Sequence, residues 1–135
     1  MARATAKAPA PLPLPSDAEI DILAVLWELG PSTVRDVHEA LGKTNRYTTT
    51  LKQIQLMTHK GLLTRTERFR SHVYEPAAPK EQTQAQIAGD VLTRAFGDSA
   101  TSLVLGALSA RPASDVELAA IRRLVVEFEK RRGSR

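Results

Sequence analysis

The stretch LLTRTERFRSHVYE, residues Leu62–Glu75, decides the fold because its pattern changes from helical to alternating. Within it, Leu62–Thr66 and His72–Glu75 are short runs of strand-type residues. Between them, Glu67–Ser71 is polar and carries two arginines. This order predicts a β-hairpin with a basic tip.

Upstream of the hairpin, a first helix is predicted to begin at Ser16 and to end at Gly30–Pro31. Ser16 and Glu19 have the spacing of a capping box, in which each side chain bonds the backbone N–H of the other residue. The apolar stripe at i, i+3, i+4 and i+7 consists of Ile20, Leu23, Ala24 and Trp27. We expect this stripe to face the core.

Two further helices are predicted before the hairpin. The second begins at Thr33, which has Asp36 three residues on as a capping partner, and ends near Gly42. The third opens at Thr48 and ends at Gly61, which suits a helix C′ position. The residues expected to face the core are Val34, Val37 and Leu41 in the second helix and Leu51, Ile54 and Met57 in the third.

Three helices followed by a hairpin within about 60 residues is the order of a winged helix-turn-helix. We therefore predict a mainly α protein whose residues 16–76 form a winged-helix DNA-binding domain. The alternative is a generic helical domain with an incidental hairpin.

The flanking regions differ in character from this domain. Residues 1–15 are rich in Pro and Ala and are predicted to be a disordered or extended arm. Residues 77–135 contain three helical stretches, at about Lys80–Phe96, Ser99–Ala110 and Ser114–Arg132. Such short helices cannot bury their apolar faces alone, so we expect a helical dimerisation region, the alternative being that they fold back on the same chain. The residues predicted to make the dimer contact are Leu103, Leu105, Leu118, Ile121, Leu124, Val125 and Phe128.

Charge is unevenly distributed along the chain. The formal net charge is +4, but residues 46–72 alone carry +5, from six basic residues against Glu67, while residues 16–45 carry −4. The basic block covers the third helix and the hairpin, and it is where a polyanion would bind. A solvated basic face is the alternative interpretation of the charge taken alone.

The segment Arg46–Lys60, which contains the third helix, is predicted to enter the major groove of DNA. With Ile54 facing the core, a rotation of ~100° per residue places hydroxyls, amides, one cation and one leucine on the outer side, without a carboxylate. Such side chains reach base edges or phosphates, and arginines beside the helix and at the hairpin tip suit phosphates or the minor groove. The predicted DNA-binding residues are Thr33, Arg35, Arg46, Tyr47, Thr48, Thr49, Lys52, Gln53, Gln55, Leu56, Arg68 and Arg70.

Several classes of protein are disfavoured. The chain has no cysteine, which excludes disulfides, thiolate metal sites and a cysteine nucleophile and suits the cytoplasm. No apolar run approaches the ~20 residues that span a bilayer, and early prolines argue against a secretory signal. The histidines at positions 38, 59 and 72 lie in no HExxH, GxSxG or Walker motif, so we expect no enzyme activity, no cofactor and no metal. A histidine pair that holds a sensory metal at the dimer contact is the alternative.

Motifs along the chain resemble those of the penicillinase-repressor family (BlaI, MecI and CopY), over roughly Leu14–Lys130. They are SDAEIDILAVLW (Ser16–Trp27), GP (Gly30–Pro31), TVRDVHEAL (Thr33–Leu41), YTT (Tyr47–Thr49), HKGLL (His59–Leu63) and RSHVYEP (Arg70–Pro76). The resemblance implies a homodimeric transcriptional repressor whose winged helices bind a two-fold operator. It further implies repression of β-lactam resistance or related operons, relieved when a membrane sensor protease triggers cleavage.

The chain departs from the family in ways that bear on regulation. It lacks the C-terminal cysteines of the copper-responsive branch, and Gly106–Ala107 stands where the β-lactam branch has its cleaved Asn-Phe bond. Thr50 and Gln53 stand where the family usually has apolar residues, and the Pro-rich arm is atypical. The sequence therefore does not identify the inducer. The rival function is a winged-helix module for protein or RNA contacts, without operator specificity.

Overall fold

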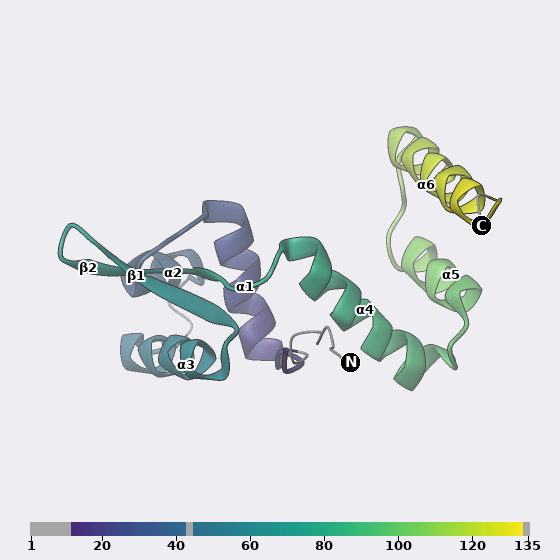
Figure 1. Ribbon diagram of the computed structural model, residues 1–135. Coiled ribbons are helices and arrows are strands. Elements are labelled where there is room, and N and C mark those ends of the chain that lie inside the picture. Colours follow the sequence, from purple (N-terminus) through teal and green to yellow (C-terminus); the bar gives the residue numbers. More distant parts are fainter. Residues whose placement is uncertain (1–11, 43–44, 134–135) are drawn as a thin grey trace, which may run out of the picture. The chain divides into compact units, whose positions relative to one another are not determined.

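The computed structural model describes residues 12–42 and 45–133. It confirms the predicted fold class, a winged helix-turn-helix followed by further helices (Figure 1). In the first part, helices α1 (Asp17–Leu29), α2 (Val34–Ala40) and α3 (Tyr47–Lys60) precede an antiparallel hairpin of β1 (Leu63–Arg68) and β2 (Ser71–Pro76). Helices α4 (Lys80–Phe96), α5 (Ala100–Ala110) and α6 (Asp115–Gly133) follow.

Contacts divide the chain into two compact units between Gly89 and Asp90, inside α4. The sequence places a domain boundary earlier, after Pro76. The first part of α4 associates with the first unit, because the Gln86 side-chain amide donates a hydrogen bond to the Leu12 carbonyl (2.7 Å). The end of the DNA-binding domain at residue 76 stays a prediction.

Only the end of the predicted N-terminal arm belongs to the described part of the chain. Residues 1–11 lie outside it. Residues 12–15 have no regular secondary structure, yet Leu12 packs against the core and Pro15 is buried. The arm is therefore anchored to the first unit at its C-terminal end.

The helices of the first unit are bounded by capping residues. The Ser16 hydroxyl accepts from the Glu19 N–H (3.3 Å), and the Ser16 N–H donates to the Glu19 carboxylate (3.0 Å). Thr33 caps α2 in the same reciprocal way. Helix α3 begins at Tyr47, one residue earlier than predicted, and ends at Gly61, whose φ of 90° is in the left-handed region that favours glycine.

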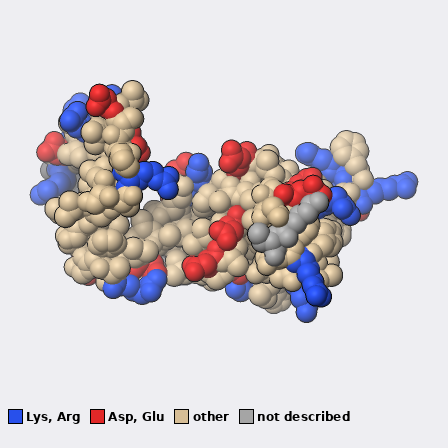
Figure 2. Space-filling view, turned by 180° about the vertical axis from the view of Figure 1, so that it is seen from behind, with Lys and Arg blue, Asp and Glu red and all other residues tan. Residues whose placement is uncertain are grey.

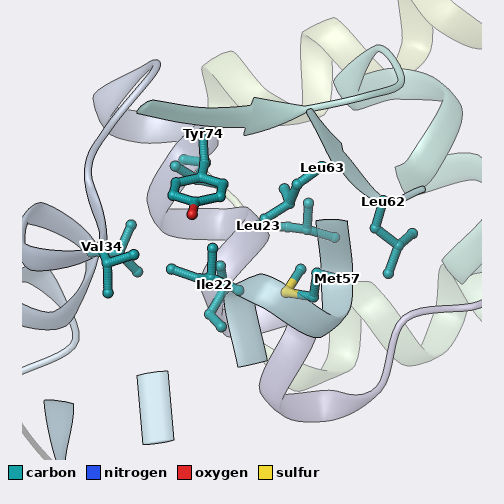
Figure 3. Close-up of a cluster of buried hydrophobic side chains, with 10 residues drawn as sticks. Ile22, Leu23, Val34, Met57, Leu62, Leu63 and Tyr74 are labelled. Atoms are coloured by element: carbon teal, nitrogen blue, oxygen red, sulfur yellow. The ribbon is translucent and has the colours of Figure 1, made fainter. Parts of the chain in front are cut away.

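The core of the first unit lies where α1, α2 and α3 meet the hairpin, and Figure 3 shows its side chains pointing toward one another. Its buried members are Ile22, Leu23, Leu26, Val34, Val37, Ile54, Met57, Leu62, Leu63 and Tyr74. Leu41 and Leu51, both predicted to face inward, are partly buried against this cluster.

The predicted apolar stripe of α1 is wrong in its orientation. The buried face consists of Glu19, Ile22, Leu23 and Leu26, so only Leu23 is shared with the prediction. Ile20 and Trp27 are half-buried and Ala24 is exposed. The buried face differs from the predicted stripe because the buried Glu19 side chain pairs with a residue of α3. A pattern of apolar residues within α1 does not include this pairing.

An isolated β-bridge that the sequence does not reveal adds to the hairpin. Ser32, between α1 and α2, exchanges two backbone hydrogen bonds with Tyr74 on β2, at 3.0 and 2.8 Å. This bridge ties the base of the hairpin to the start of α2. It therefore fixes the position of the hairpin relative to the helices.

In the second unit, α5 and α6 leave large apolar side chains exposed, among them Leu105, Val116 and Phe128. Gly106 on α5 allows close packing: a Cβ at this position would lie 3.3 Å from the Phe96 ring. No helix within residues 12–42 and 45–133 is both long and apolar enough to cross a membrane.

Candidate nucleic-acid interface

The outer face of α3 is polar and exposed. Thr48, Thr49, Lys52 and Gln55 are exposed on it, and Leu56 has half of its surface exposed. Helix α3 contains no carboxylate that would repel phosphates. Of the predicted set on this helix, Gln53 lies on the flank and is half-buried.

The opposite face holds α3 firmly in the first unit. Thr50, Ile54 and Met57 are fully buried, so Thr50 takes a core position although its side chain is polar. The Thr50 hydroxyl lies 3.4 Å from Nδ1 of His38 on α2, which gives this buried oxygen a hydrogen-bonding partner. These contacts fix which residues α3 presents outward.

An ion pair secures the C-terminal end of α3. The Lys60 ammonium donates to the buried Glu19 carboxylate at 2.8 Å. Burial alone would raise the pKa of Glu19, but the lysine and the bonds with Ser16 outweigh it and hold that pKa below its ordinary value. Lys60 is therefore oriented toward α1 and away from the outer face of the helix.

A cavity of ≈ 430 Å³ lies between α2, α3 and the hairpin. It brings together four of the predicted DNA-binding residues, and no carboxylate lines it. The four are Thr33, Arg35, Tyr47 and Gln55. Arg35 lies over the Tyr47 ring, 5.5 Å from its centroid, so its guanidinium is positioned by a cation–π contact.

Three polar residues that line this cavity are absent from the predicted DNA-binding set: Arg65 on β1 and Ser71 and His72 on β2. Side chains alternate between the two faces of a strand, and this alternation could have predicted which strand residues share a face. In the hairpin, Arg65 pairs with Tyr74 across the strands. The sequence alone does not fix the strand register on which that prediction depends. Thr33 also caps α2, as predicted, because its hydroxyl accepts the Asp36 N–H (3.1 Å).

The hairpin tip carries the two predicted wing arginines, Arg68 and Arg70, both exposed and outside the cavity. Arg46, before α3, is also exposed and outside the cavity. Figure 2 shows Lys and Arg side chains projecting at the end of the first unit that carries the hairpin turn. The first unit therefore offers an exposed polar helix face flanked by basic side chains.

The second unit contains all of the predicted dimer residues. A cavity of ≈ 430 Å³ is lined by Val104 of α5 and by four of the predicted residues of α6. These four are Ile121, Leu124, Val125 and Phe128. Leu103, Leu105 and Leu118 lie outside this cavity, and Val104 was not among the predicted residues.

The described residues contain no group of three or more His, Asp or Glu side chains placed to hold a metal ion. The basic side chains beside α3 and at the hairpin turn form a surface that suits an anionic ligand.

Comparison with known proteins found a matching family model, similar sequences and a similar solved structure. The family model for the penicillinase repressor matches residues 15–127. The chain is 31% identical over 122 residues to Transcriptional regulator BlaI of Mycobacterium tuberculosis, in strains CDC 1551 / Oshkosh and H37Rv, which covers 88% of each protein. A solution structure of monomeric Bacillus licheniformis BlaI in complex with the blaP half-operator is 26% identical, with a TM-score of 0.47, and covers 53% of this chain and 89% of that one.

Proposed function

Because the chain belongs to the penicillinase repressor family and is a DNA-binding transcriptional repressor, we propose that it binds a two-fold operator as a homodimer. In this proposal α3 lies in the major groove and the hairpin is the wing. The observation that carries it is the outer face of α3, which is exposed and free of carboxylates while the inner face is buried.

Each group of residues has a role in the proposal. The hydroxyl and amide side chains of α3 contact base edges, and Leu56 suits the thymine methyl group. Arg46, Lys52 and the cavity residue Arg35 contact phosphates, which position the protein without specifying sequence. The wing arginines bind the DNA beside the site that α3 occupies.

Dimerisation is proposed through the second unit. The apolar cavity of α5 and α6, which is lined by Val104, Ile121, Leu124, Val125 and Phe128, would be covered by the same surface of a second copy, as in an isologous interface. A two-fold dimer would place its α3 helices about 34 Å, or a multiple of it, apart along the DNA. The operator would then be an inverted repeat.

The test of this function is selection of bound DNA from a random-sequence library, followed by affinity measurement. We expect the selected duplex to be an inverted repeat that binds about 10³–10⁷-fold tighter than random duplex. Equal affinity for both duplexes would contradict the repressor proposal and favour a module that contacts protein or RNA.

A sensor-linked protease as partner, and a cytoplasmic location beside the DNA, stay predictions from the family. The bond that matches the family's cleavage position, Gly106–Ala107, lies inside α5, and Gly106 is half-buried. Cleavage there would first require local unfolding of the helix, because its backbone is hydrogen-bonded.

Lys52→Ala should weaken binding to every duplex and reduce the slope of log affinity against log salt by about one. The reason is that the exposed Lys52 ammonium of each protomer would neutralise one phosphate and so release about one counterion from the DNA. Titrations at several salt concentrations measure the slope per half-site.

Lys80→Ala is the matched control for this titration, since Lys80 is also exposed but lies at the start of α4. It should leave the slope unchanged. An unchanged slope for Lys52→Ala as well would remove Lys52 from the phosphate contacts.

A further inference from the structure

Phe69 occupies an unusual position at the tip of the wing. Its exposed fraction is 93%, the largest among the exposed large hydrophobic residues of the described chain. Single exposed apolar residues are common on protein surfaces, so this exposure does not by itself indicate a function. The backbone and the neighbours of Phe69 supply that indication.

The backbone at the tip is in a conformation that suits other residues better. Arg68 and Ser71 form the last pair of the hairpin, so the turn consists of Phe69 and Arg70 alone. Both have positive φ, 51° and 65°. Two-residue turns of this kind favour Asn-Gly or Asp-Gly, because side chains with a Cβ are strained there. Strain retained at an exposed tip is typical of functional positions.

Two cations flank the ring along the chain. Arg68 and Arg70 are exposed, and no ion pair joins either of them to another described residue. A ring flanked by two guanidinium groups that form no ion pair with the described residues suits a ligand that combines anionic rims with an apolar interior. The minor groove of DNA is such a ligand, with phosphates on both sides of a narrow channel walled by sugars.

The wing is long enough to project beyond the helix that is proposed to lie in the major groove (Figure 1). Strand β1 has six residues, which at about 3.3 Å per residue extend about 17 Å from the base of the hairpin. Figure 1 shows the hairpin turn projecting beyond α2 and α3, free of other elements.

We propose that the Phe69 ring inserts into the minor groove beside the operator half-site while Arg68 and Arg70 contact the phosphates on its two sides. This inference rests on the proposed function above and adds a contact that is apolar rather than electrostatic. The strained turn is retained because it presents the ring at the end of the wing, where Asn or Gly would present none.

Phe69→Gly is the variant that tests the contact. Glycine adopts a positive φ without strain, so the melting temperature should be equal to or above that of the wild type. Loss of the ring should lower affinity for the duplex selected by the wild-type protein about 10- to 100-fold for a dimer with two tips, as expected for apolar burial. The salt slope should not change, because no charge is removed. A merely structural role for Phe69 would lower the stability and the affinity together.

Two control variants separate the ring from its surroundings. Phe69→Leu keeps an apolar side chain and should retain most of the affinity, whereas Arg68→Ala should reduce the salt slope by about one per half-site. Hydroxyl-radical footprinting reports cleavage of the sugars that line the minor groove. The wild type should protect sugars beside each half-site, and Phe69→Gly should lose that protection alone.

The outcomes distinguish this inference from the proposed function. If the wild type does not prefer the selected duplex over random DNA, the proposed function fails. If the wild type does prefer it and Phe69→Gly binds with the same affinity and footprint, the minor-groove contact is refuted. A Phe69→Gly variant that keeps its DNA affinity but changes oligomeric state in light scattering would place the ring in a protein contact and would also refute the inference.

Discussion

Leu124→Asp is expected to give a monomer and to lower affinity for the selected operator about 10²–10⁴-fold. Leu124 lines the apolar cavity of the second unit and has 54% of its surface exposed. In a two-fold interface one substitution places two carboxylates in the contact, one from each copy. The free-energy cost of burying such a charge without a partner is far larger than the stabilisation that the replaced apolar contact contributed.

The loss of DNA affinity follows from the loss of the dimer. When two α3 helices are joined in one dimer, binding of the second half-site becomes intramolecular and benefits from a high effective concentration. A monomer binds each half-site separately and forfeits this gain. The fold of the monomer should be retained, because Leu124 belongs to none of the buried positions of the described chain.

Light scattering gives the oligomeric state, and titration of full and half operators gives the affinity. Val116→Asp is the matched control, since Val116 is an exposed apolar residue of the same helix outside the cavity. It should remain dimeric. If Leu124→Asp is also dimeric, the interface lies elsewhere than the cavity face of α6.

The local features of this fold could be predicted from sequence because they depend on residues a few positions apart. The capping boxes at Ser16 and Thr33, the helix end at Gly61 and the hairpin all follow from short-range spacing. The outer face of α3 could also be predicted from sequence, since one buried residue, Ile54, fixes the rotation of the whole helix.

The features that sequence analysis missed depend on residues far apart in the chain. The buried stripe of α1 begins at Glu19 because a lysine 41 residues away neutralises that carboxylate. A polar residue at the start of an apolar face is not recognised by a count of hydrophobic positions. The cavity residue Arg65 was missed in the same way, because its neighbours are fixed by strand register and by the bridge from Ser32 to Tyr74.

Lys60→Met should lower the free energy of unfolding at neutral pH by about 1–3 kcal/mol, a factor of about 5–150 in the folding equilibrium. Methionine retains most of the apolar stem but removes the ammonium that pairs with Glu19 at 2.8 Å. Glu19 is only 5% exposed, so its carboxylate would be left without a charged partner in a place that water hardly reaches. The bonds with Ser16 remain and keep the loss below that of a fully orphaned charge.

The pH dependence identifies the carboxylate as the cause. In the wild type the pKa of Glu19 lies below its ordinary value of 4.5, so the pair stabilises the fold above about pH 4.5, and this contribution is lost as the pH falls through the lowered pKa. Without Lys60, burial should dominate and raise that pKa. The variant is then penalised at neutral pH and relieved on acidification, when the carboxyl group takes up a proton.

The difference in stability between wild type and Lys60→Met should therefore be largest near neutral pH and should shrink toward about pH 3. Chemical unfolding at a series of pH values measures it. Lys52→Met is the matched control, because it is the same substitution at an exposed position of the same helix that makes no ion pair with another described residue. That control should change stability by less than about 0.5 kcal/mol at every pH. A loss in Lys60→Met that is independent of pH would mean that packing of the lysine stem, and not the buried charge of Glu19, anchors the end of α3.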